Sequence, residues 1–371
     1  MRRQLALLPL AALALAFFGA AALSAQPTCT GVNRVTWPTV NPIWDFCWTR
    51  PSQTMQPDGE GIRITEVFYR GRKVWKDGGI PVLNVKYAPG GCGGGGLCFR
   101  DWFDSERSFT CAPSPSTGYC TGTTTPVSTV CNHPGTDAGS FSGVAVVDKG
   151  TSIKLTSQAQ AGWYRYIATW EFFADGRIHP GMDITAVNNS CVAFTHRHHA
   201  YWRFDFDLDG NTNNFAESIG PAVSTRVMTE KTWTDKTNER SQWRFGRVGS
   251  STRAYVARDS KDGFADGDTF GKIDGAVLAY KSTELHDSSS GCDINIAPFV
   301  TTESVNNTDL VLWVHSETDH IGEPGGIAAD CSMFGPTIKL RTAAIPADFN
   351  GDATSEVKLY QNGTWVSFQV P

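Results

Sequence analysis

The chain has 371 residues, of which 32 are Lys or Arg, 37 are Asp or Glu and 10 are Cys. With 40% hydrophobic residues it is long enough to bury a large core, which excludes a small disulfide scaffold and a disordered acidic tail. The net charge of -5 gives no basic footprint for phosphate contacts, so we expect no nucleic-acid partner.

The first 25 residues are expected to be a signal peptide. Arg2 and Arg3 precede an apolar run over residues 5–23, and Ser24 and Ala25 provide small side chains at a cleavage point. An uncleaved anchor is the alternative, because about 18 apolar residues can just span a bilayer. The mature chain is then expected to be secreted or periplasmic, without a membrane partner after signal removal, and to consist of an N-terminal extension and one domain, over residues 26–58 and 59–371.

The cysteines all lie after the expected signal peptide. An even number of cysteines in an exported chain favours up to five disulfides over metal-bound thiolates. Cys111 and Cys120 could close a loop rich in Pro, Ser and Thr. The pairing of the other cysteines stays open.

Strand-like segments dominate the sequence. Stretches rich in Val, Ile, Thr and aromatic residues recur at short intervals between turn formers, and helical periodicity is scarce, which predicts an all-β protein. Two or three strands are expected after Gly59. Further strands are expected within residues 142–156, 163–178, 192–208, 277–281, 308–316 and 336–341.

The segment FTHRHHAYWRFDFDLDG over residues 194–210 contains a histidine pair. Alternate side chains of a strand share a face, so His196 and His198 lie on the apolar side. Burying two neutral imidazoles is costly, and a metal ion that binds both offsets this cost. Two histidines that form hydrogen bonds in the core are the alternative.

A third histidine follows from the segment DLVLWVHSETDH over residues 309–320. The same alternation places His320 on the apolar face and His315 on the opposite one. Three imidazoles suit Cu(II) or Zn(II) and leave a coordination position open for chemistry. A zinc hydrolase is therefore one function that this pattern allows.

These motifs together resemble the catalytic domain of the copper amine oxidases, whose fold is a large antiparallel β-sandwich and whose cofactor is topaquinone. The family's His-x-His strand continues to an Arg, an Asp and a final Asp-Gly, found here at Arg203, Asp205 and residues 209–210. Its later strand reaches the third copper ligand eleven residues after an Asp, as Asp309 and His320 do. The resemblance covers roughly residues 59–350 and implies that His196, His198 and His320 bind Cu²⁺.

The resemblance also implies catalytic residues. Tyr164 holds the position of the tyrosine that becomes topaquinone, and Tyr87 resembles the tyrosine that contacts the cofactor's oxygen. Asp104, in the segment WFDSE, matches the family's catalytic base, with Asp101 as a nearby competitor. The residues beside Tyr164 depart from the family's pattern: Trp163 replaces an Asn, and Arg165 replaces an acidic residue.

Three carboxylates match the family's peripheral calcium site. Asp205 and Asp207 lie on the polar face of the histidine strand, and Asp309 begins the later strand. Carboxylate oxygens are the ligands that Ca²⁺ prefers. A solvated acidic strand end is the alternative.

The function that the resemblance implies is oxidative deamination. A primary amine or a peptidyl-lysine side chain and O₂ would be converted to an aldehyde, hydrogen peroxide and ammonia. The resemblance also implies a homodimer, the assembly that the family forms. The departures at Trp163 and Arg165 leave a second function open, namely a copper-binding protein of the same fold without topaquinone. Which amine is the substrate does not follow from the sequence.

Overall fold

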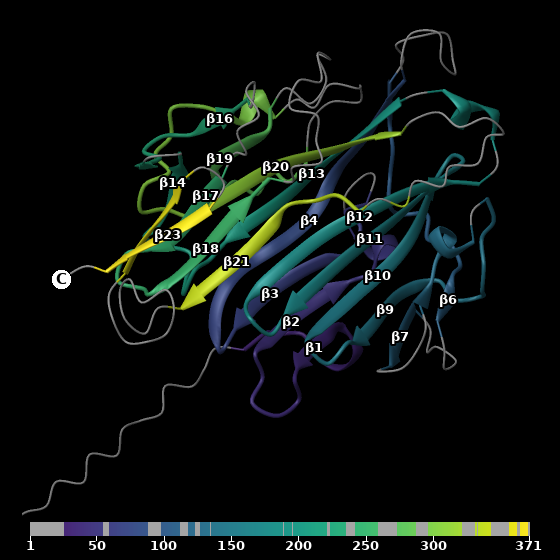
Figure 1. Cartoon of the computed structure of the whole chain (residues 1–371), viewed down its shortest axis with the longest axis horizontal. Helices are drawn as coiled ribbons and strands as arrows, with labels where there is room; N and C mark the ends of the chain where they lie inside the picture. The colour runs from purple at the N-terminus through teal and green to yellow at the C-terminus, as the bar shows by residue number, and fades with distance from the viewer. Residues whose placement is uncertain are drawn as a thin grey trace, which may run out of the picture.

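The computed structural model describes residues 26–54, 59–87, 98–111, 118–122, 127–133, 135–187, 189–194, 196–220, 223–234, 242–258, 273–286, 296–320, 331, 333–342, 356–361 and 364–369. Two large β-sheets make up most of this part of the chain (Figure 1). The expected signal peptide lies outside the described residues. No helix in the described ranges is both long and apolar enough to cross a membrane.

The first sheet has nine strands, and its middle carries the histidine segment. All adjacent strands of this sheet pair in the antiparallel sense, and β5 pairs with β4 beside the main path. In spatial order the main path is β1 (Arg34–Trp37), β2 (Trp44–Thr49), β3 (Arg63–Tyr69), β4 (Arg72–Tyr87), β13 (His196–Phe206), β20 (Leu310–His320), β19 (Gly275–Ala279) and β16 (Lys231–Trp233), with β5 (Cys98–Arg100) at the side.

The second sheet has ten strands, and all but one of its pairings are antiparallel. The parallel pair is formed by its last two strands. The order is β15 (Ser224–Arg226), β14 (Asn214–Ile219), β17 (Gln242–Arg247), β18 (Thr252–Ala257), β21 (Thr337–Thr342), β12 (Arg177–Ala186), β11 (Tyr164–Phe173), β10 (Ser152–Ala161), β9 (Gly143–Asp148) and β7 (Gly118–Gly122).

Short elements complete the described structure. Two small antiparallel pairs lie outside the large sheets, and the helical elements are single 3₁₀ turns. The pairs are β6 (Thr110–Cys111) with β8 (Val127–Ser128) and β22 (Glu356–Gln361) with β23 (Thr364–Gln369); the 3₁₀ turns are η1 (Gly31–Asn33), η2 (Pro51–Gln53), η3 (Val130–Asn132), η4 (Ser190–Ala193) and η5 (Ala297–Phe299).

The main core lies between the two sheets. Trp75 of β4 and Trp170 of β11 are fully buried, and their ring centroids lie 6.0 Å apart across the interface. Phe204 of β13 packs against both rings, at 5.7 and 6.1 Å. The alternating inward side chains of the strands therefore build one apolar layer, as expected of a β-sandwich. The expectation of a mainly β, antiparallel sandwich is confirmed.

The strand positions expected from the sequence agree with those observed, with three refinements. The region expected over residues 142–156 contains two strands, β9 and β10, with a turn between them, and β10 continues to Ala161. The region expected over residues 163–178 contains β11 and the start of β12. The expected N-terminal extension contributes β1 and β2 to the first sheet, where β2 pairs with β3. Residues 26–54 are therefore part of the sandwich.

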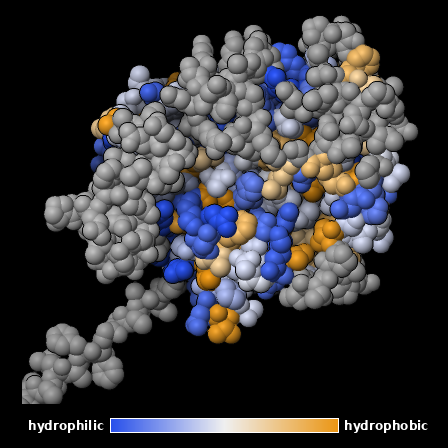
Figure 2. All heavy atoms as spheres, in the orientation of Figure 1, coloured by the Kyte–Doolittle hydropathy of each residue, from blue (hydrophilic) through white to orange (hydrophobic). Residues whose placement is uncertain are grey.

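Three disulfides are described. Cys111 and Cys120 are bonded, which confirms the expected loop closure. The other two disulfides join Cys29 to Cys47 and Cys131 to Cys331. The coloured part of the face in Figure 2 mixes hydrophilic and hydrophobic residues, and no single apolar patch dominates it.

Candidate metal centre

Two histidines of β13 point into the space between the sheets. Strand alternation places His196 and His198 on the inner face, and their exposed fractions are 2% and 0%. The ring centroids lie 4.8 Å apart. The sequence expectation that both imidazoles lie on the buried face is thus met by the geometry.

The neighbouring strands place two further predicted residues beside His196. The antiparallel register pairs His196 with Tyr87 of β4 on one side and with His320 of β20 on the other. The Tyr87 ring is buried and its centroid lies 4.8 Å from that of His196. The backbone of His320 is therefore adjacent to the pair, while its side chain lies outside the described atoms.

Tyr164 reaches this centre from the opposite sheet. It is the first residue of β11 and is 3% exposed. Its phenol oxygen lies 2.8 Å from Nε2 of His196 and 2.6 Å from the hydroxyl of Tyr87. The structure thus brings together Tyr87, Tyr164 and His196, three residues from distant segments that the family resemblance implies share one site.

Tyr166 extends the same network, because a spacing of two residues keeps it on the face of Tyr164. Its hydroxyl donates a hydrogen bond to Oδ2 of Asp101 and lies 2.9 Å from Nδ1 of His198. Since the phenol proton is directed to Asp101, the oxygen accepts from the Nδ1–H of His198. A carboxylate, a phenol and an imidazole therefore form one chain of hydrogen bonds.

The hydrogen bonds select the tautomer of both imidazoles. Nδ1 of His196 lies 2.6 Å from the carbonyl oxygen of Phe194, which can only accept, so this nitrogen carries the proton. Nε2 of His196 then has a lone pair and accepts from the Tyr164 hydroxyl, which in turn accepts from Tyr87. In His198 the contact with Tyr166 leaves the lone pair on Nε2 in the same way.

This arrangement fits a metal ion that is bound through Nε2 of both histidines. Metal-bound histidines characteristically donate their other N–H to a carbonyl or to a carboxylate-linked partner, which sets the tautomer and the ring orientation. The carbonyl of Phe194 is this partner for His196. Tyr166, which is linked to Asp101, is the partner for His198. The residues present therefore fit a nitrogen-bound transition metal, and Tyr164 lies beside its expected position.

Burial changes the acidity of the groups around the centre. Removal from water raises the pKa of Tyr87 to about 12, and that of Tyr164 rises further because the Tyr87 hydroxyl also lies beside it. Burial raises the pKa of Asp101 to about 7, although the hydrogen bond from Tyr166 opposes this shift. Asp101 is therefore a carboxyl group that can exchange a proton near neutral pH.

Asp104, the expected catalytic base, is an exposed residue. None of its described hydrogen bonds or ion pairs links its carboxylate to Tyr164, so its role stays a prediction. Asp101, the competitor three residues earlier, is 6% exposed and belongs to the hydrogen-bond chain. Asp101 and Asp104 differ in burial because of the path that their loop takes. The sequence alone does not reveal this path, so it could not distinguish the two carboxylates.

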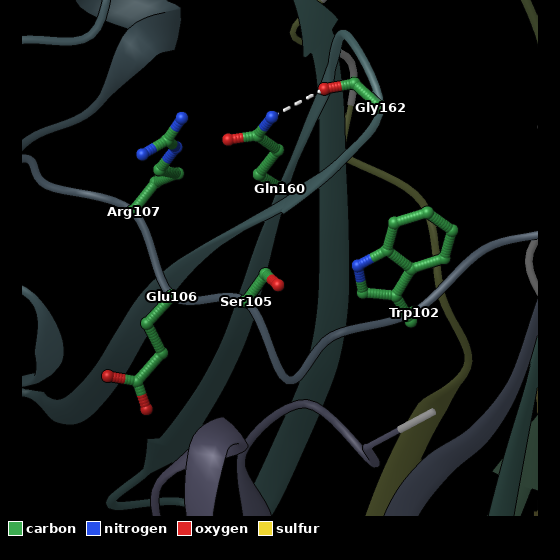
Figure 3. Close-up of a pocket in the computed structure, with 6 residues that line it drawn as sticks. All are labelled: Trp102, Ser105, Glu106, Arg107, Gln160 and Gly162. Atoms are coloured by element: carbon green, nitrogen blue, oxygen red, sulfur yellow. Dashed lines mark hydrogen bonds between the residues drawn. The ribbon is translucent and has the colours of Figure 1, made fainter. Parts of the chain in front are cut away.

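A surface pocket of about 320 Å³ lies at the turn between β10 and β11 (Figure 3). Trp102 and Gly162 line it, together with Gln160, whose Nε2 donates to the carbonyl oxygen of Gly162 at 2.7 Å. Trp102 directly follows Asp101, and Gly162 lies two residues before Tyr164. The pocket is therefore formed by the two chain segments that also supply the buried centre.

Trp163 and Arg165, the two residues beside Tyr164 that differ from the family's pattern, point in different directions. Arg165 points to the other face of β11, where its guanidinium forms a paired contact with Asp137 at 2.8 Å for each hydrogen bond. Trp163 remains near the centre, with its ring centroid 5.8 Å from that of Tyr164. The charge change at Arg165 is thus directed away from the phenol, whereas the extra bulk of Trp163 is beside it.

The three carboxylates predicted to bind calcium converge at the far end of β13. One oxygen from each of Asp205, Asp207 and Asp309 lies within 4.8 Å of the others. Burial, and then the charge of a neighbouring carboxylate, raises the pKa of both Asp205 and Asp309. Lys73 contacts Asp207 at 2.6 Å and neutralises part of the charge.

Comparison with known proteins connects the fold to one group of structures. No protein-family model matches the chain, and the search of curated proteins finds no match. Among solved structures, a copper-containing benzylamine oxidase from Hansenula polymorpha matches with a TM-score of 0.61 at 11% identity, covering 91% of this chain and 63% of that chain. An amine oxidase from Aspergillus nidulans matches with a TM-score of 0.58 at 13% identity, covering 90% and 55%.

A lysyl oxidase from Pichia pastoris also matches, with a TM-score of 0.55 at 11% identity and coverage of 88% of this chain and 55% of that chain. The chain thus spans less than two thirds of each of these three structures. Identities this low show a shared fold alone. The chain therefore has the antiparallel β-sandwich fold of copper amine oxidase structures, to which it is distantly similar.

Proposed function

We propose that the protein is a copper-dependent amine oxidase. The overall reaction converts a primary amine, O₂ and water to an aldehyde, ammonia and hydrogen peroxide. One observation supports this proposal most strongly: the phenol oxygen of Tyr164 lies between the hydroxyl of Tyr87 and Nε2 of His196. A tyrosine in this position is adjacent to the expected metal and to a second phenol that can orient its oxygen.

The proposed metal ligands are His196 and His198 through Nε2, and His320 from the neighbouring strand. The first two have the required tautomer, and the register supports the third. Copper and a topaquinone derived from Tyr164 would supply the oxidising chemistry, namely cofactor formation with O₂ and acceptance of two electrons from the amine. Three nitrogen ligands suit Cu(II) and leave room in its coordination shell.

Asp101 is proposed to remove the α-proton of the amine. Its pKa of about 7 lets it accept a proton at neutral pH and release it again within one catalytic cycle. Its hydrogen bond from Tyr166 restricts the orientation of the carboxylate. This proposal replaces Asp104 by Asp101 in the catalytic role, and the matched pair of variants described below separates the two.

The proposed approach for the amine is the pocket in Figure 3. Trp102 offers an apolar surface for the substituent of the amine, and its neighbour Asp101 is the proposed base. Glu106, another lining residue, accepts hydrogen bonds from Arg50 at 2.9 and 3.0 Å and is therefore already neutralised. The proposed substrate class is a primary amine, either free or at the end of a peptidyl-lysine side chain.

A copper-binding protein without topaquinone is the second candidate function. The position of Trp163 favours it, because the indole adds bulk next to Tyr164 where oxidation requires O₂ to reach the ring. Such a protein would bind copper through the same histidines and leave Tyr164 unmodified. A zinc hydrolase would instead retain zinc on purification without added metal.

The carboxylate group of Asp205, Asp207 and Asp309 is proposed to bind Ca²⁺. Three buried or half-buried carboxylates repel one another, and a hard divalent cation offsets this repulsion. Their place at the end of β13 and the start of β20 means that bound Ca²⁺ would hold together the strands that supply the histidines.

Peroxide release tests the proposed function. Copper-loaded protein is incubated with a panel of primary amines, and hydrogen peroxide and aldehyde are measured. The Tyr164→Phe variant is the control, because it keeps the ring and loses the oxygen. Equal yields of aldehyde and peroxide from the wild-type protein alone support an oxidase; copper binding without turnover supports the second candidate.

A further inference from the structure

A second histidine cluster lies on the outer face of the first sheet, behind the candidate metal centre. His199 directly follows His198 and therefore points to the opposite side of β13. The register pairs His199 with Glu317 and Tyr201 with His315 of β20. His199, His315 and Glu317 consequently share one face of two paired strands, and their exposed fractions are 0%, 0% and 1%.

The three side chains converge on a single small space. Nδ1 of His199 lies 2.9 Å from Nε2 of His315 and 3.3 Å from Oε2 of Glu317, and the last two atoms are 4.0 Å apart. Bonds of about 2.0–2.1 Å to a tetrahedral metal ion separate its ligand atoms by roughly 3.3 Å. The observed distances bracket this value, so movements of a few tenths of an ångström would complete the geometry.

Charged side chains surround the outer nitrogen of the His315 ring. Nδ1 lies 3.4 Å from Nη2 of Arg258, which donates to it, and 3.8 Å from Oδ1 of Asp274. Metal binding at Nε2 would require Nδ1–H to turn to this carboxylate, which is the common partner of a metal-bound histidine. Arg258 pairs with the same carboxylate at 3.1 Å and neutralises it. The ring of Tyr201 stacks on His315 with centroids 4.5 Å apart and restricts its rotation.

We propose that His199, His315 and Glu317 bind a second divalent transition-metal ion of the zinc class. Two imidazoles and one carboxylate are a ligand set that zinc takes in proteins. The site's burial, beside an apolar cluster that includes Val82 and Trp313, makes its role structural: it joins β13 to β20 from behind the first centre. This proposal does not depend on the oxidase activity.

Cobalt substitution tests the site with a readout that needs no turnover. The double variant His196→Ala/His198→Ala removes the first centre, and calcium in the buffer occupies the carboxylate group of Asp205, Asp207 and Asp309. This protein is expected to bind one equivalent of Co²⁺ with the visible d–d absorption of a low-symmetry site. Zn²⁺ should displace the cobalt and bleach the absorption.

The further variants distinguish ligands from packing residues. His315→Gln and Glu317→Gln, each added to the double variant, should lose the bound equivalent and the absorption. Tyr201→Phe retains the stacked ring and should keep both, which makes it the matched control. Circular dichroism establishes that each variant is folded.

Two results would overturn the proposal: no Co²⁺ or Zn²⁺ bound by the folded double variant, or unchanged binding in both Gln variants. In either case the cluster is a set of hydrogen-bonded core residues. If the double variant does not fold, metal content of the otherwise unmodified chain decides the matter, with two transition-metal equivalents expected and one after Glu317→Gln. A content of one in both proteins would equally overturn it.

Discussion

The phenol oxygen of Tyr164 and Nε2 of His196, which belong to opposite sheets of the sandwich, lie 2.8 Å apart. The hydrogen bond from His196 to the Phe194 carbonyl leaves Nε2 as the acceptor, so the phenol donates to it. A metal ion at Nε2 would take the place of this hydrogen bond and lie next to the Tyr164 oxygen. The proposed function follows from this one contact more than from any other.

Asp101→Asn is expected to reduce kcat by about 10²–10⁴-fold, because a general base contributes this much to proton removal. In the unmodified protein kcat should increase with pH through about 7, as Asp101 loses its proton. The pH profile of amine oxidation measures both effects. Asp104→Asn is the matched variant and is expected to stay within a few fold of wild type; the opposite ranking would return the role of base to Asp104.

The same carboxyl group should make stability depend on pH. The folded-state pKa of Asp101 is raised above its unfolded value, so its stabilising contribution is complete below about 4 and is lost as the pH rises through about 7. Asp101→Asn is therefore expected to flatten the decrease in Tm over this pH range. Equal pH dependence of Tm in the variant and the wild type would contradict the assignment of the raised pKa.

Tyr166→Phe removes the oxygen that connects His198 to Asp101. Loss of such a partner of a metal-bound histidine is expected to weaken copper binding by about 10–100-fold, while the ring still fills the core. Competition with a chelator of known affinity measures the change. Tyr69→Phe, a buried tyrosine of β3, serves as the control and should bind copper like the wild type.

Calcium should raise Tm through Asp205, Asp207 and Asp309. Without the cation the raised pKa values of Asp205 and Asp309 make stability fall as the pH rises, because ionisation adds repulsion. Asp309→Asn should abolish the calcium shift and, at neutral pH, stabilise the calcium-free protein. Asp175→Asn, at an exposed turn, should leave the shift intact. A calcium-induced increase in Tm that persists in Asp309→Asn would show that these three carboxylates do not bind the calcium.

Strand alternation predicts the faces of the histidines, whereas the places of Tyr87 and Tyr164 in the centre follow from the family resemblance. Alternation along β13 places His196 and His198 on the buried face, and the same rule predicts that His320 lies on the apolar face of its strand. These predictions depend only on backbone geometry within a strand, which a sequence expresses directly. The all-β class followed from composition for the same reason.

Contacts between strands could not be predicted in this way. The pairing of His199 with Glu317 depends on the register of β13 against β20, which no single segment encodes. The burial of Asp101 and the exposure of Asp104 depend on how the loop after β5 packs against β11. The partner of Arg165, Asp137, comes from a distant loop in the same way.

Mass analysis of the peptide that contains Tyr164, after aerobic loading of the protein with Cu²⁺, tests the central claim most directly. The account predicts a residue that has gained two oxygen atoms and lost two hydrogen atoms, together with reaction of the loaded protein with phenylhydrazine. The modification should be absent from His196→Ala loaded under the same conditions. A Tyr164 peptide of unchanged mass in copper-saturated wild-type protein would contradict the account.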